Sequence, residues 1–130
     1  MATYFARGGT ADNLRTAEKR AALAQALKVI GRPLRKVLGL PPDHTRLNSD
    51  AGELTRLLYG MLAPQATVDI MPALGTHAPM TEAQLRLMFG RSIPRERFRV
   101  HDWRHGLRRV GEVPGRLIRE WSEGRVDYSV

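Results

Sequence analysis

The sequence predicts an α/β fold in which a mostly parallel sheet lies between layers of helices. Two observations predict it. Short apolar runs that end at proline or glycine alternate with longer segments of helical periodicity. Each apolar run is followed by a polar loop and a helix start, which is the order of a strand-loop-helix unit. Strands joined in this way lie parallel with helices on both faces, so we expect a three-layer α/β domain with right-handed crossovers.

The first predicted helix is Asp12–Ile30, which is rich in alanine, leucine, glutamate and basic residues. Gly31 can cap its C-terminal end, and Pro33 prevents the helix from continuing. The apolar run KVLGL, Lys36–Leu40, predicts a short buried strand that two prolines end. Asp43–Ser49 then reads as a polar loop.

The next two units repeat this order. A second helix is predicted to start at Ser49 or Asp50 and to end before Pro64, because its leucines follow at helical spacing. The run TVDIMPAL, Thr67–Leu74, predicts the second strand. The capping-box pattern at Thr81–Gln84 predicts a third helix that ends at Gly90. RFRV, residues 97–100, predicts a third short strand, and the last residues of the chain read as the start of a further strand in the sheet.

A chain of 130 residues suits one domain with a single core. We assign residues 1–31 to an N-terminal segment with the lead helix and residues 32–130 to the α/β domain. Cysteine is absent, which excludes disulfides and thiolate metal sites and fits a reducing compartment. Met1–Phe5 is followed by Arg7 and two glycines, so this stretch is too short for a signal peptide or a membrane span. We expect a cytoplasmic protein.

The net charge of +8 raises nucleic-acid binding as a hypothesis. Most of the 21 basic residues are arginines spread along the chain, however, and no nucleic-acid motif accompanies them. A loose basic region between Arg91 and Arg109 is interrupted by acidic and apolar residues. We therefore interpret the charge as a solvated surface rather than as a polyanion site.

The polar residues that follow the predicted strands are the candidate site, because ligands of open parallel sheets bind beyond the carboxyl ends of the strands. His77 on a strand-to-helix turn could exchange a proton near neutral pH, and Arg46 offers a donor fork for a carboxylate or phosphate. This combination suits a small organic acid. A loop histidine can equally be a surface hydrogen-bonding group, and both readings stay open. The three loops supply Asp43, His44, Thr45 and Arg46; Thr76 and His77; and His101, Asp102, Trp103 and Arg104.

A metal site is not predicted, because no two histidines have the spacing of a helical zinc site except His101 and His105, whose segment shows little helical pattern. Glycine-rich phosphate-binding motifs and a nucleophile elbow are also absent from the sequence.

Four motifs together resemble the N-terminal domain of the nickel-dependent lactate racemase family: PPDHTR, SDAGELTRLLY, PALGTHAPMTEAQLRLMFG and HDWR. The likeness covers about residues 32–130. It implies a racemase or epimerase of a 2-hydroxy acid that transfers a hydride to a nickel-pincer nucleotide. It implies that His77 is a catalytic acid/base residue and that Asp43 and Arg46 face cofactor and substrate. From their places after the predicted strands, we add Thr45 and Thr76 as binding residues and His101 and Asp102 as candidates for supporting them.

The resemblance also implies parts that this sequence does not supply. The family's second catalytic histidine and its cofactor-anchoring lysine have no counterparts here, since the last lysine is Lys36. We therefore expect half of an active site, inactive alone and without a covalently bound cofactor, that is complemented by a C-terminal domain or by self-association. The alternative is a binding or regulatory module that keeps the cleft without chemistry.

Overall fold

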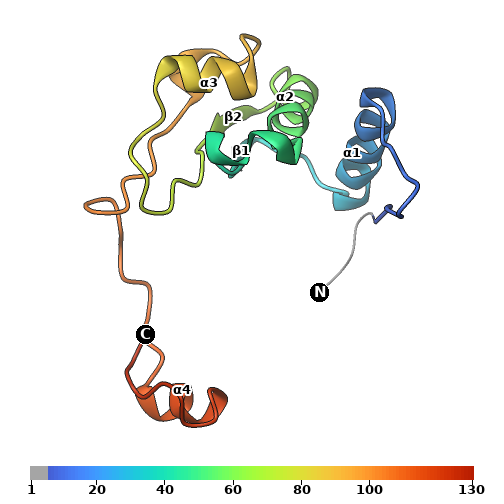
Figure 1. Cartoon of the computed structure of the whole chain (residues 1–130). Coiled ribbons are helices and arrows are strands. Elements are labelled where there is room, and N and C mark those ends of the chain that lie inside the picture. The colour runs from blue at the N-terminus through green and yellow to red at the C-terminus, as the bar shows by residue number, and fades with distance from the viewer. Residues whose placement is uncertain (1–5) are drawn as a thin grey trace.

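The computed structural model describes residues 6–130, which form an α/β chain around a two-stranded parallel sheet (Figure 1). The predicted α/β class with parallel strands is confirmed. The prediction that Met1–Phe5 is too short for a signal peptide or a membrane span concerns residues outside the described range. The elements are α1 (Thr16–Ile30), β1 (Lys36–Gly39), the 3-10 helix η1 (His44–Ser49), α2 (Ala51–Leu62), β2 (Thr67–Ile70), α3 (Glu82–Phe89), the 3-10 helix η2 (Arg95–Arg97) and α4 (Gly115–Trp121).

The helix α1 starts four residues later than predicted, because its N-terminal cap lies at Arg15 rather than at Asp12. The Glu18 carboxylate accepts a hydrogen bond from the Arg15 backbone N–H at 3.0 Å. Gly31, with φ of +66°, ends the helix as predicted. The helix has no fully buried residue, and Lys19 ties it to α2 through an ion pair with Glu53 at 2.6 Å.

The sheet is shorter than predicted because proline interrupts both strands. β1 and β2 pair in parallel from Lys36 with Thr67 to Gly39 with Ile70. Met71 donates to the Gly39 oxygen, but Pro41 has no N–H for the return hydrogen bond, so regular pairing ends at Gly39 and Ile70. The predicted third strand is reduced to one parallel bridge between Ile70 and Phe98, because the turn η2 takes up the preceding residues.

The core lies on one face of this sheet, beneath α2 and α3. Val68 and Ile70 of β2 and Leu85 and Phe89 of α3 are all less than 7% exposed. The two helices approach closely at Gly52, where a Cβ would lie 2.0 Å from the carbonyl oxygen of Met88. Only glycine allows this contact, so α3 has a fixed position above the end of β2.

The other face of the sheet is open within the described residues, and this differs from the three layers that the strand pattern predicts. Leu38, which points to this face of β1, is 51% exposed. Asp69 lies on the same face of β2 and forms ion pairs with Arg99 at 2.9 Å and with Arg97 at 3.7 Å. In Figure 1 the helices α1, α2 and α3 lie above and beside the strands, not beneath them.

The C-terminal residues form a separate small unit instead of a strand of the sheet, so the prediction of a further strand there is wrong. Gly115 to Trp121 form α4, and Val113 and Val130 exchange two backbone hydrogen bonds with each other. The unit lies away from the sheet (Figure 1). These residues therefore add no strand to the sheet. Across residues 6–130, every helix is too short or too polar to cross a membrane.

Candidate functional site

The carboxyl ends of the two strands bring the first two predicted loops together. Beyond the regular sheet, Pro42 and Ala73 form an isolated parallel bridge, and the Ala73 N–H donates to the Pro41 oxygen at 2.8 Å. The two segments that follow β1 and β2 therefore keep the register of the sheet past Pro41 and Pro72. The loop that begins at Asp43 and the turn that follows Leu74 consequently lie side by side, as the strand-end argument predicted.

Asp43 is held by its own loop. One carboxylate oxygen, Oδ1, accepts two hydrogen bonds from Thr45, at 3.0 Å from the backbone N–H and at 2.5 Å from the hydroxyl. The carboxylate thereby caps η1, which forms where the sequence predicted only a loop. The side chain of Asp43 is only 4% exposed, so its second oxygen has a fixed direction.

That second oxygen, Oδ2, lies 2.6 Å from Nδ1 of His77. The histidine reaches it from a four-residue turn in which its backbone N–H donates to the Leu74 oxygen at 2.9 Å. Gly75 in this turn has φ of +57°, a conformation that a residue with a Cβ adopts only with strain. Because the His77 side chain is 54% exposed, its far edge faces the solvent-filled space beside the turn.

The electrostatics of the pair decide which ring nitrogen carries the proton. Burial alone would raise the pKa of Asp43, but the hydrogen bonds from Thr45 and His77 outweigh it and lower the pKa from 3.8 to about 2. The carboxylate is therefore ionised at neutral pH and can only accept hydrogen bonds. In neutral His77 the proton must lie on Nδ1, and Nε2 keeps its lone pair as a base.

His77 lines an open cleft of about 520 Å³ between the two loops. Arg46 and Thr76 line it beside the His77 pair, and Arg46 makes no ion pair with any residue in the described range. The cleft thus combines one oriented base, one free guanidinium and two threonines. It contains all five of the residues that the sequence placed in the centre of the site: Asp43, Thr45, Arg46, Thr76 and His77.

The structure does not bring the third predicted loop to this cleft. The chain leaves the sheet after Arg99, because only Phe98 and Arg99 reach β2. Asp102 instead accepts hydrogen bonds from the backbone N–H groups of His105, at 3.0 Å, and Arg104, at 3.2 Å. The His105 hydrogen bond is the main cause of the lowered pKa of Asp102. His101 and Asp102 therefore do not support the His77 pair here.

One contact near the site, between Gln84 and His44, was not predicted from the sequence. The Gln84 amide nitrogen lies 2.9 Å from Nε2 of His44, while its oxygen accepts the Thr81 N–H at 2.8 Å in the predicted capping box. Since the amide nitrogen can only donate, Nε2 of His44 must accept. This contact joins the Asp43 loop to the start of α3. The capping glutamine was visible in the sequence, but nothing there indicated its second partner.

The residues of the cleft fit an anion better than a metal ion. Among residues 6–130, no three histidine, aspartate or glutamate side chains gather as metal ligands. Arg46 and the Thr76 hydroxyl are instead suited to a carboxylate or a phosphate.

A crystal structure of a protein from Thermotoga maritima is similar to this chain, with a TM-score of 0.72 and 23% sequence identity over 90% of the chain. The chain spans 29% of the length of that protein. At this level of identity the likeness shows the α/β fold alone. No protein-family model matches the chain, and a search of the curated proteins finds no match.

Proposed function

We propose that this chain is the N-terminal, acid/base-bearing part of a lactate-racemase-like enzyme, which racemises or epimerises a small 2-hydroxy acid. The observation that supports the proposal most directly is the 2.6 Å contact between Asp43 and Nδ1 of His77 at the edge of the cleft. It orients an imidazole as a base, which is the arrangement that proton transfer requires.

The substrate class follows from the other groups of the cleft. A 2-hydroxy acid carries a carboxylate, which Arg46 can bind through two parallel hydrogen bonds. Its hydroxyl then lies next to carbon 2, within the same small molecule, and can be directed toward Nε2 of His77. In this pose His77 takes the hydroxyl proton while the hydride of carbon 2 would pass to an acceptor held outside this chain. His77 returns the proton when the hydride comes back to either face of carbon 2.

The hydride of carbon 2 needs an acceptor, for which the resemblance implies a nickel-pincer nucleotide. The described residues do not fit nickel, because no set of three ligands gathers, and no lysine follows Lys36 as a covalent anchor. We therefore derive no step through that group. The proposal assigns to this chain the base and the anion-binding residues, and assigns the cofactor ligands to a complementing polypeptide. We place the protein in the cytoplasm, as its lack of cysteine suggests.

A second candidate is a binding module that recognises the same small acid without chemistry. It is favoured by the single histidine of the cleft, since the resemblance implies two acid/base histidines on opposite sides of the substrate, and His101 does not line the cleft.

Chiral chromatography separates the two candidates. The chain joined to its complementing polypeptide is incubated with L-lactate and nickel-pincer nucleotide, and its His77→Gln variant serves as the control. Formation of D-lactate that disappears in His77→Gln supports the enzyme. Calorimetric binding of lactate without conversion supports the binding module. Absence of both binding and conversion refutes the whole assignment.

A further inference from the structure

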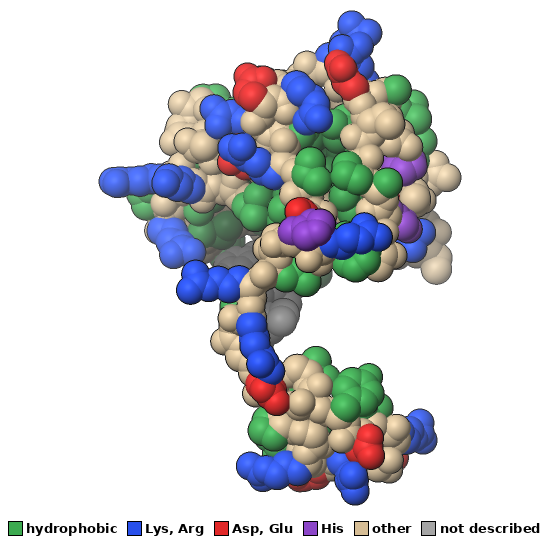
Figure 2. Space-filling view, turned by 90° about the vertical axis from the view of Figure 1, so that its left-hand side faces the viewer, with side chains coloured by type: hydrophobic (Ala, Val, Ile, Leu, Met, Phe, Trp, Pro, Cys, Tyr) green, Lys and Arg blue, Asp and Glu red, His purple; other side chains and the backbone are tan. Residues whose placement is uncertain are grey.

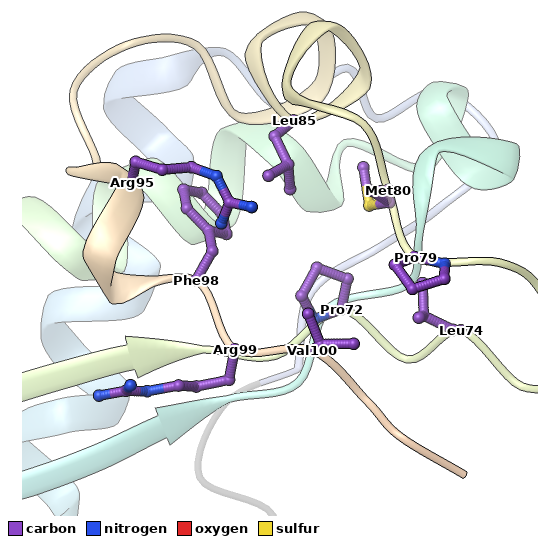
Figure 3. Close-up of a pocket in the computed structure, with 9 residues that line it drawn as sticks. All are labelled: Pro72, Leu74, Pro79, Met80, Leu85, Arg95, Phe98, Arg99 and Val100. Carbon is purple, nitrogen blue, oxygen red and sulfur yellow. The ribbon is translucent and has the colours of Figure 1, made fainter. Parts of the chain in front are cut away.

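A second hollow lies next to the turn that carries His77, since Leu74 and Pro79 on either side of that turn both line it. Its walls are mostly apolar: Met80 precedes α3, Leu85 lies in α3, and Pro72 and Val100 come from the chain beyond the sheet. Figure 3 shows these four side chains converging on one space, with the Phe98 ring and the Arg95 side chain closing one side of it. The hollow has a volume of about 20 Å³. That is room for the tip of one side chain rather than for a whole small molecule, whose sites typically enclose roughly 300 Å³ or more.

The hollow continues into a wider and shallower groove. Leu85, Arg95 and Phe98 line both spaces, and the groove runs on past Gly90 to Ile93 with a volume of about 210 Å³. A deep apolar spot with an open groove beside it is the shape that accepts one anchoring side chain and the polypeptide around it.

The charge of this surface indicates what that polypeptide must carry. Four arginines and one glutamate line the two spaces, a net charge of +3. Arg86 is paired with Glu82, and Arg99 is paired with Asp69. Arg91 and Arg95 have no acidic partner among residues 6–130, and Figure 2 shows basic side chains projecting around apolar ones on this side of the larger part. These groups belong to the basic region that the sequence singled out and the His77 cleft does not use.

We propose that this groove, lined by Met80, Leu85, Phe98, Arg91 and Arg95, binds a peptide segment of a partner protein that carries one large apolar side chain flanked by carboxylates. The tip of the apolar side chain enters the hollow between Met80 and Leu85, the rest of it lies in the adjoining groove, and the carboxylates pair with the two free guanidinium groups. A second copy of the chain fits poorly, since each copy brings a net charge of +8 to the contact. The proposal is independent of the chemistry assigned to His77.

Fluorescence anisotropy with three labelled synthetic peptides tests the proposal on the whole chain. The first peptide carries one leucine flanked by glutamates; the second has serine in place of the leucine; the third has lysine in place of each glutamate. The first peptide is expected to bind. The second should bind at least about 10-fold more weakly, because it lacks the anchor, and the third should not bind measurably.

Charge reversal at the groove provides the matched test. Arg95→Glu should weaken the first peptide at least about 10-fold and should create binding of the lysine peptide, whereas Arg20→Glu, the same change on the exposed side of α1, should alter neither. Arg91→Glu is the second groove variant should Arg95→Glu fail to fold by circular dichroism.

Four results would overturn the proposal. The serine peptide could bind as tightly as the first, or Arg95→Glu and Arg91→Glu could both leave affinity unchanged. Single-stranded DNA could bind more tightly than the acidic peptide and respond to the same variants, which would assign the groove to nucleic acid. Light scattering could show a dimer that Arg95→Glu dissolves, which would assign it to a second copy.

Discussion

Replacing Asp43 by asparagine should invert the protonation of the His77 ring while leaving the fold in place. The asparagine oxygen can still accept both hydrogen bonds from Thr45, which now bind Oδ1 of the carboxylate at 3.0 and 2.5 Å. Its amide nitrogen then faces Nδ1 of His77, where it can only donate. Neutral His77 must therefore expose a lone pair at Nδ1 and carry its proton on Nε2, so the cleft loses its base.

The cost to stability follows from the pKa of Asp43. The folded protein lowers this pKa from 3.8 to about 2, and a difference of that size corresponds to about 2 kcal/mol of folding free energy at neutral pH. Asp43→Asn should lose about this amount in urea unfolding followed by circular dichroism. Asp127→Asn is the control, because Asp127 is 69% exposed in the C-terminal unit and its loss should leave the unfolding of the sheet unchanged.

Nitrogen-15 NMR of the histidine rings measures the tautomer directly. In the native chain the proton-bearing nitrogen of His77 should be Nδ1, and in Asp43→Asn it should be Nε2. If the native ring carries its proton on Nε2, or if the variant leaves the ring unchanged, Asp43 does not orient His77 and the reasoning fails.

Three further predictions concern the same framework. Thr45→Val removes the hydroxyl donor of Asp43 while keeping the shape, so the pKa of Asp43 should rise and unfolding should cost about 1 kcal/mol less, as urea titration would show; an unchanged pKa would contradict the role of the hydroxyl. Lowering the pH from about 4 to about 2 should remove the stability that depends on ionised Asp43, since its folded pKa lies below the unfolded one, and Asp43→Asn should lack this part of the acid transition. Gly52→Ala should destabilise the chain by about 1–3 kcal/mol because its Cβ would collide with the Met88 carbonyl, whereas Gly60→Ala on the same helix meets open space and should be neutral or stabilising; equal effects of the two in thermal unfolding would refute the close approach of the helices.

The sequence predicted the strand-loop-helix order because the glycines, prolines and capping residues that start or end each element act locally. Gly31 ends α1 and the Thr81–Gln84 box starts α3, as expected from their capping chemistry. The same locality explains the convergence of the Asp43 loop with the His77 turn, since two parallel strands must deliver their following loops to one edge.

The errors arose where tertiary contacts decide the outcome. The sequence pattern of RFRV, residues 97–100, predicted a strand. The turn after Pro94 leaves only Phe98 and Arg99 within reach of β2. The last residues have strand-like composition, yet Val130 pairs with Val113 across α4 rather than with the sheet. Because the third strand is so short, His101 and Asp102 leave the sheet before the cleft, and no local pattern could reveal that.

The most direct test of the proposed function is calorimetric titration of the chain with D-lactate and L-lactate separately. A site that interconverts the two enantiomers must accept both, with the carboxylate on Arg46 and the hydroxyl on His77. We predict that both bind with similar affinity, that propionate, which lacks the hydroxyl, binds more weakly, and that Arg46→Gln and His77→Gln each weaken both enantiomers. Binding of only one enantiomer, or binding that neither variant weakens, would contradict a racemase site at the Asp43–His77 pair.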